Sequence, residues 1–128
     1  MKKRHIFYLC TKCGNLIGLV QDKGVPLVCC SREMKELVPN TFEASEEKHL
    51  PAVTVTGDII TVQVGSTLHP MDAEHLITFV YVETENGGQR KGLKAGDEPI
   101  LSFCFMNDKP IAVYAYCNLH GIWKTDVK

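Results

Sequence analysis

Cysteine and histidine residues carry the clearest chemical signal in this sequence. Six cysteines and five histidines occur among 128 residues. Four of the cysteines lie in the first quarter of the chain, in the stretches CTKC and VCC: Cys10, Cys13, Cys29 and Cys30. Four of the histidines lie beyond residue 48. The simplest interpretation is two metal sites in two modules.

The first candidate site consists of these four cysteines. Four thiolates can surround one ion tetrahedrally, and soft sulfur ligands select zinc or iron. The spacing favours neither metal. Gly14 follows the CxxC and permits a backbone turn in which amides point at sulfur. Because Cys29 and Cys30 are adjacent, where zinc ribbons have a second CxxC, we expect a distorted site.

The second candidate site gathers ligands from three distant stretches, EEKHLP, HPMDAEH and CNLHGIWK. They contain five possible ligands: His49, His69, His75, Cys117 and His120. A single histidine is more often a surface or hydrogen-bonded residue than a ligand. Structural zinc needs only four tetrahedral ligands, whereas iron accepts four imidazoles in a plane with a thiolate beneath. That arrangement leaves one position open for a substrate.

The segments that must position these ligands predict a mostly β fold. Gly- and Asn-containing turns separate runs of β-branched and aromatic residues at 52–57, 59–65, 76–88, 100–105 and 111–117. We predict a small N-terminal metal knot followed by an antiparallel β-sandwich. The predicted domains are residues 1–37 and 49–128, joined by a polar linker at 38–48.

Composition limits the classes of function. With 45% hydrophobic and 23% charged residues the chain is globular, and a net charge of -1 gives no reason to expect nucleic acid or a membrane as partner. The apolar run at residues 6–9 is shorter than the roughly 7–15 residues of a signal peptide core. We therefore predict a cytoplasmic protein whose cysteines bind metal rather than form disulfides.

The ligand motifs also carry a family resemblance. EKHLP, HPMDAEH and CNLHGIWK, in this order after a CxxC and CC module, resemble desulfoferrodoxin, the two-iron class of superoxide reductase. The first module is similar to desulforedoxin, which implies an Fe(Cys)4 centre. For the second site the resemblance implies iron held by four equatorial histidines and by axial Cys117. It also implies an immunoglobulin-like sandwich from residue 50 onwards.

The activity implied by this resemblance is reduction of superoxide to hydrogen peroxide. Electrons come from an external donor such as rubredoxin, and the family favours a homodimer. Lys48 places a cation beside the anionic substrate, and Glu47 resembles the family carboxylate that occupies the open position of oxidised iron. Without the resemblance, Lys48 is an ordinary linker lysine and Glu47 belongs to a solvated acidic cluster. The family pattern has an aromatic residue where this chain has Leu76.

Three further residues receive no catalytic role. We expect Cys104 in the core, because buried free cysteines behave as small hydrophobes. His5 has no companion at ligand spacing, and Trp123 is predicted to form core or a wall of the site. Two alternative functions stay open: a protein-binding module made of a zinc knuckle and a β-sandwich, and a one-electron carrier. Metal content and reaction with superoxide distinguish the three.

Overall fold

A computed structural model describes residues 5–127 of the chain. Residues 1–4 and 128, at the outer ends of the two predicted domains, lie outside the described residues. The chain divides into two compact units, the first ending at Val38 and the second beginning at Pro39. Within the described range, no helix is both long enough and apolar enough to cross a membrane.

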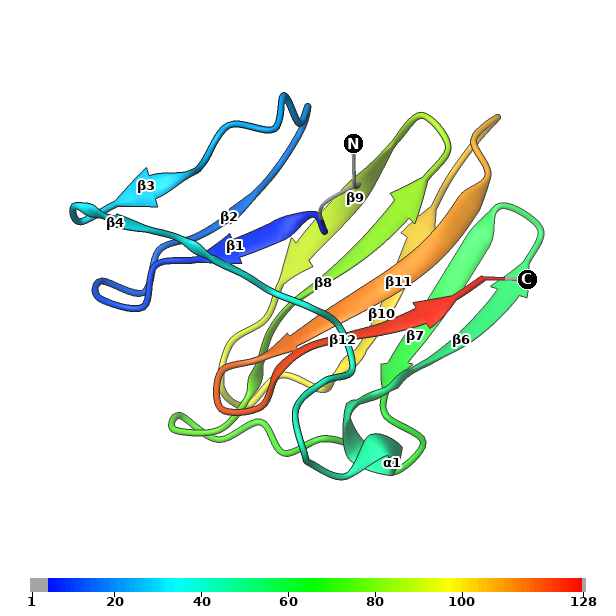
Figure 1. Cartoon of the computed structure of the whole chain (residues 1–128). Helices are drawn as coiled ribbons and strands as arrows, with labels where there is room; N and C mark the ends of the chain where they lie inside the picture. The colour runs from blue at the N-terminus through cyan, green and yellow to red at the C-terminus, as the bar shows by residue number, and fades with distance from the viewer. Residues whose placement is uncertain (1–4, 128) are drawn as a thin grey trace. The chain divides into compact units, whose positions relative to one another are not determined.

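The first unit is built from very short antiparallel strands. Three of them form a sheet in the order β2-β1-β5, and two more pair as β3-β4 (Figure 1). Their bounds are β1 (Phe7–Leu9), β2 (Leu16–Gly18), β3 (Val28–Cys29), β4 (Arg32–Glu33) and β5 (Lys35–Glu36). Several apolar side chains of this unit are exposed, among them Val20, Val25 and Val28. The unit is therefore too small to be held together by apolar burial alone, as expected for a metal knot.

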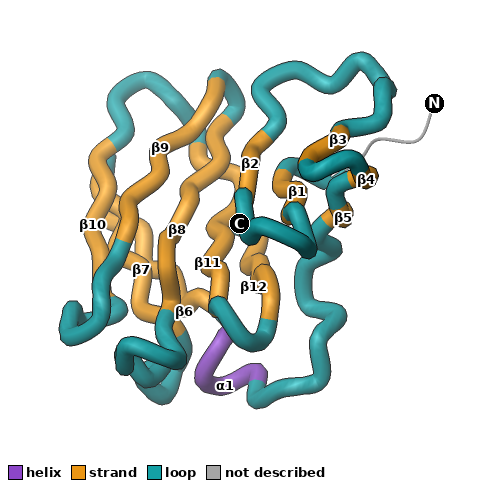
Figure 2. The backbone as a smooth tube through the Cα atoms, turned by 90° about the vertical axis from the view of Figure 1, so that its left-hand side faces the viewer, coloured by secondary structure: helices purple, strands orange, loops and turns teal. Residues whose placement is uncertain are grey.

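The second unit is a two-layered antiparallel sandwich, visible in Figures 1 and 2. One sheet has the strand order β10-β7-β6 and the other β12-β11-β8-β9. Their bounds are β6 (Pro51–Thr56), β7 (Ile59–Val64), β8 (Ile77–Thr84), β9 (Gly87–Gly92), β10 (Ile100–Cys104), β11 (Pro110–Cys117) and β12 (Gly121–Asp126). The predicted fold class, a mostly β chain with a cysteine knot followed by a sandwich, is confirmed.

Alternation along the strands explains which side chains form the core. Ile60, Val62 and Val64 of β7 are buried and face the opposite sheet, as the period of two requires. In β10 the same alternation buries Phe103 and turns Cys104 outward. The prediction that Cys104 lies in the core is therefore wrong: an apolar run contains one buried and one exposed face.

Strand β9 was not predicted, because its sequence GGQRKG contains no apolar residue and every position in it is exposed. It pairs with β8 alone. The Lys91 ammonium donates to the Ser102 carbonyl and lies 4.9 Å from the centre of the Phe103 ring. Gln89 Nε2 donates to the Cys104 carbonyl at 3.4 Å. These polar side chains occupy backbone acceptors of β10, an edge strand, which discourages pairing with another chain.

One end of the sandwich gathers the segments that matter for chemistry. The short helix α1 (Glu46–His49) lies there, and Figure 1 shows the loop before β8 and the turn between β11 and β12 at the same end. The Thr67 backbone N–H donates to the Glu47 carbonyl at 2.9 Å, which ties that loop to α1. The helix has four residues and so leaves no helical period in the sequence.

Candidate metal centres

The four cysteines of the first unit form one compact cluster. The sulfurs of Cys10, Cys13, Cys29 and Cys30 all lie within 4.8 Å of one another. Cys13 Sγ is 3.7 Å from Cys29 Sγ, which is 4.0 Å from Cys30 Sγ. Tetrahedral bonds of about 2.3 Å place sulfurs about 3.8 Å apart. The cluster therefore fits a single tetrahedral ion.

Two backbone reversals bring these sulfurs together. Gly14 has a φ of 86°, and the next N–H, that of Asn15, donates to Cys13 Sγ at 3.4 Å. Cys30 and Ser31 have φ of 54° and 61°, in the left-handed region. Successive side chains of a strand point to opposite faces, so this turn after β3 is what allows adjacent cysteines to face one ion.

The electrostatics of the cluster favour a cation. A hydrogen bond from the Cys13 backbone N–H lowers the pKa of Cys10 to about 6, which favours the thiolate that binds metal. The neighbouring sulfurs of Cys13 and Cys10 instead raise the pKa of Cys30 to about 12. Four negative sulfurs at this spacing repel one another, and a bound cation removes that penalty.

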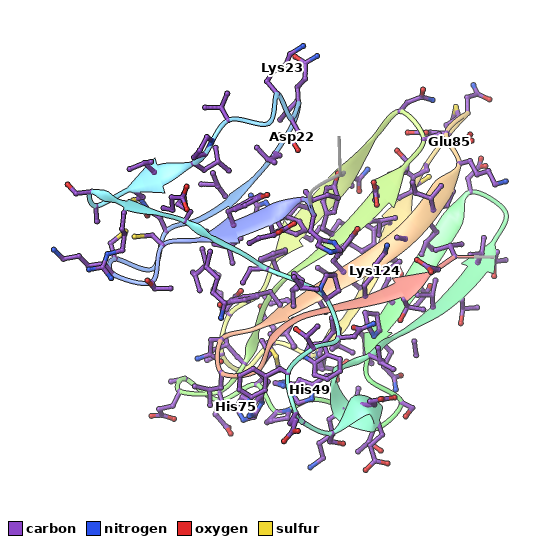
Figure 3. The ribbon with its side chains drawn as sticks, viewed as in Figure 1. Asp22, Lys23, His49, His75, Glu85 and Lys124 are labelled. Carbon is purple, nitrogen blue, oxygen red and sulfur yellow. The ribbon has the colours of Figure 1, made fainter. Side chains whose placement is uncertain are left out.

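The second cluster brings together all five predicted ligands of the second unit. Ligand atoms of His49, His69, His75 and Cys117 lie within 4.8 Å of one another. His120 Nδ1 is 3.1 Å from His49 Nε2 and 3.7 Å from Cys117 Sγ. His49 comes from α1, and Cys117 closes β11. Figure 3 shows His49 and His75 at the α1 end of the sandwich, away from Glu85.

The four imidazoles occupy the corners of a square. Ring centres of neighbours, in the order 49, 69, 75, 120, are 4.7, 4.7, 5.0 and 4.9 Å apart. The opposite pair, His49 and His75, is separated by 6.4 Å. The diagonal of a square is about 1.4 times its side, close to the ratio seen here. Neighbouring rings are nearly perpendicular, at 76° to 88°.

Hydrogen bonds fix the tautomers of two of these rings. His49 Nδ1 lies 2.7 Å from the Ser45 carbonyl, and His69 Nδ1 lies 2.6 Å from the Pro70 carbonyl. A carbonyl only accepts, so both Nδ1 atoms carry the proton and both Nε2 atoms present a lone pair. Those two Nε2 atoms are 3.2 Å apart. Two acceptors face each other at about the 3.0 Å expected for neighbouring nitrogens on a metal with bonds of about 2.1 Å.

Burial favours the neutral, metal-binding form of two of these histidines. It lowers the pKa of His69 to about 4 and also lowers that of His49. His75 Nε2 is buried with no hydrogen-bond partner among the described residues. Burial raises the pKa of Cys117, against the effect of the Leu119 and His120 backbone N–H groups. A cation at the centre of the square satisfies the unpartnered nitrogen and lets the buried thiol ionise.

Aromatic side chains line this cluster. The Trp123 ring is 2% exposed and stacks on His49 with ring centres 5.0 Å apart, while its Nε1 donates to the His120 carbonyl at 3.0 Å. Trp123 is thus a wall of the site, as predicted. Phe42, half exposed, contacts the His120 ring edge-on at 5.3 Å. His5 and Leu76 contribute no ligand to either cluster.

The two predicted catalytic residues lie on α1, next to His49. Glu47 and Lys48 are both exposed. Gly65 packs directly under their backbone, where an added Cβ would collide with the Glu47 carbonyl. With 3.6 residues per turn, Lys48 starts about 100° and Glu47 about 200° around the helix from His49. Glu47 therefore begins on the side of α1 away from the ligand.

Known proteins match this chain over nearly its whole length. The sequence model of the family described as desulfoferrodoxin matches residues 41–126. The desulfoferrodoxin of Nitratidesulfovibrio vulgaris is 37% identical over 98% of this chain and 99% of its own. A desulfoferrodoxin homolog of Archaeoglobus fulgidus is 39% identical over 92% of this chain and 94% of its own. The chain belongs to the desulfoferrodoxin family.

A solved structure agrees with this membership. The superoxide reductase from Treponema pallidum superposes with a TM-score of 0.80 at 34% identity, covering 96% of this chain and 99% of that one. A one-iron superoxide reductase from Giardia intestinalis matches 64% of this chain with a TM-score of 0.55 at 29% identity.

Some residues around the second cluster were missed by sequence reasoning. Phe42 is the one aromatic residue in the polar stretch between the modules, and that isolation is a usable signal. Ser45 holds the His49 ring only through its backbone carbonyl. Every residue has such a group, so the sequence gives no signal for this contact. Asn118 lies inside the CxxH motif, and its amide makes hydrogen bonds to the segment that carries His75.

Proposed function

We propose that this protein is a superoxide reductase, an oxidoreductase that converts superoxide, one electron and two protons into hydrogen peroxide and so detoxifies superoxide. The observation that carries the proposal is the square of four imidazoles with a cysteine sulfur beside it. Zinc prefers four tetrahedral ligands, whereas a square of nitrogens with one thiolate suits iron and leaves a sixth position for a small ligand. Relatives named superoxide reductase share this fold.

The ligands of the catalytic iron are His49, His69, His75 and His120 with Cys117, and those of the other centre are Cys10, Cys13, Cys29 and Cys30. Bound there, iron supplies the electron that superoxide takes up, and the thiolate raises electron density at the metal. The first centre holds iron or zinc. Burial lowers the pKa of His49 and of His69, so protons compete less with the metal for these two ligands at pH 7.

Lys48 attracts the substrate and organises its protonation. The charge of the whole chain is -1, so any attraction for the superoxide anion has to be local. Lys48 is exposed and adjoins the ligand His49, where its ammonium can also order a water that delivers a proton. Glu47 acts after the reaction, as a carboxylate ligand of the oxidised site. Because it starts on the far side of α1, this role requires the segment to shift.

Each turnover leaves the site oxidised, so an external electron donor has to reduce it again. We propose a small rubredoxin-like protein as this donor, a homodimer as the working assembly, and the cytoplasm as its location. The domains are residues 1–37, an Fe(Cys)4 module, and 49–128, the reductase sandwich, with a linker at 38–48. A homodimer gives the small first unit the additional contacts that its own apolar surface lacks.

Metal analysis and a superoxide pulse test the proposal. Two metal ions per chain, with iron in the second site, and rapid appearance of the absorption of the oxidised second site when superoxide is added to the reduced protein are expected. One zinc and a colourless protein would instead identify a binding module, and two irons that ignore superoxide would identify an electron carrier. Either result would overturn the assignment.

Replacing Lys48 tests the local electrostatic argument. A unit charge about 4 Å from the substrate is worth about 1 kcal/mol in water, so Lys48→Ile should slow the reaction about fivefold at low salt. The effect should disappear at high ionic strength, which screens exposed charges. Lys109→Ile is the matched control, because it changes the net charge equally from the β10–β11 loop. Equal slowing in both variants would remove Lys48 from the mechanism.

A further inference from the structure

Three hydrogen bonds connect the turn between β11 and β12 to the loop that carries His75. Asn118 Oδ1 accepts from the Leu76 backbone N–H at 3.0 Å, and Asn118 Nδ2 donates to the Glu74 carbonyl at 2.9 Å. The Asn118 backbone N–H donates to the Leu76 carbonyl at 3.2 Å. The Asn118 side chain therefore hydrogen-bonds to the backbone on both sides of His75.

Only a carboxamide of this length can make both side-chain bonds at once. It offers one acceptor and two donors at the end of a short, stiff side chain, and here the acceptor and one donor are matched to complementary backbone groups. The bonds join residues separated by more than 40 positions in the sequence. Asn118 directly follows Cys117 and lies two residues before His120. Its hydrogen bonds therefore connect His75, one corner of the square, to two other ligands.

The position of the His75 ring depends on the backbone segment that carries it. Carbonyls of Ser45 and Pro70 hold the rings of His49 and His69. His75 Nε2 is buried with no hydrogen-bond partner among the described residues, as expected for a nitrogen that faces a metal. The backbone of His75 closes a tight turn with Asp72 through bonds of 3.0 and 3.2 Å. The position of that turn consequently decides where the fourth ring lies.

We propose that Asn118 is a positioning residue: its carboxamide sets the place of His75 relative to Cys117 and His120, and so completes the second metal centre. This inference rests on the proposed function only in requiring that these five side chains hold a metal. Removing a hydrogen-bonding partner of a ligand commonly costs about 10–100-fold in metal affinity. We expect a loss of this size for iron(II) in Asn118→Ala.

The experiment compares metal binding in full-length variants. Iron(II) is titrated anaerobically against a chelator into Asn118→Ala, Asn118→Asp and Leu119→Ala, and the absorption of the oxidised second site is recorded. Asn118→Asp keeps the acceptor for Leu76 N–H and loses the donor to Glu74, so its affinity should fall between those of the parent and Asn118→Ala. Leu119 is exposed in the same turn and is the control.

Two further readouts separate positioning from general destabilisation. The melting temperature of the metal-free protein should change little in Asn118→Ala, because the amide is exposed to water, while affinity falls and the absorption band shifts. Metal content of the four-cysteine centre should stay the same in every variant. Unchanged affinity and absorption in Asn118→Ala, or an equal loss in Leu119→Ala, would overturn the inference. If Asn118→Ala does not fold, unchanged iron(II) affinity in Asn118→Asp would overturn the inference instead. Both results stand whether or not the protein reacts with superoxide.

Discussion

Burial of neutral histidines should make the metal-free protein sensitive to acid. His69 is 2% exposed, and burial lowers its pKa from 6.5 to about 4. A histidine with a lower pKa in the folded state binds more protons when unfolded, so stability is lost as the pH falls from 6.5 towards 4. Between pH 7 and 4.5 this linkage removes about 2.5 kcal/mol. Burial also lowers the pKa of His49, which adds to the loss in the same direction.

The assay is urea unfolding of the full chain after metal removal, at pH 7 and pH 4.5. Trp123, the single tryptophan, reports on the second unit by fluorescence. The parent should lose about 2.5 kcal/mol more than His69→Gln over this interval, because the variant lacks the titrating ring. His5→Gln removes an exposed histidine and should follow the parent. If parent and His69→Gln lose the same stability, burial of a neutral His69 is not the cause of the acid sensitivity.

Two other substitutions probe the opposite ends of the sandwich. Gly65→Ala should destabilise the second unit by about 1–3 kcal/mol in urea unfolding, because the added Cβ would collide with the Glu47 backbone. Gly92→Ala is the control and should cost less, because a Cβ there would make only ordinary contacts. Equal costs in the two variants would contradict this packing argument. Asp108→Ala should lower the free energy of unfolding by about 1–3 kcal/mol, because the carboxylate accepts a hydrogen bond from the hydroxyl of buried Thr84 at 2.6 Å. The rate of reaction with superoxide should stay unchanged. A slower rate would show that the end of the sandwich that carries Asp108 affects the metal site.

The sequence was most informative where residue type alone decides the outcome. Thiolates and imidazoles are the side chains that bind transition metals, so Cys10 and His49 could be recognised without knowing the fold. A run of β-branched residues bounded by turns predicted β7, since such side chains favour strands. The apolar pattern gave the wrong prediction for Cys104, because an apolar run does not show which of the two faces of the strand is buried.

Arrangement in space was harder to predict than composition. The hydrogen bonds of the Asn118 side chain join two segments that are distant in sequence, and no local pattern predicts which carbonyl an amide will reach. The square of rings likewise depends on Ser45 and Pro70 through their backbone carbonyls, which every residue possesses. Gly65 looks like any turn glycine until the backbone of Glu47 is seen against it.

The two centres differ in how much chain must be made before each can close. A ribosome delivers the chain from its N-terminus at roughly 5–20 residues per second. Every ligand of the first cluster lies between Cys10 and Cys30, whereas the second waits for the turn that brings Cys117 and His120. The order of metal insertion should then follow the order of translation, and a chain stalled before Cys117 would have all ligands of the first centre while the second still lacked two of its own.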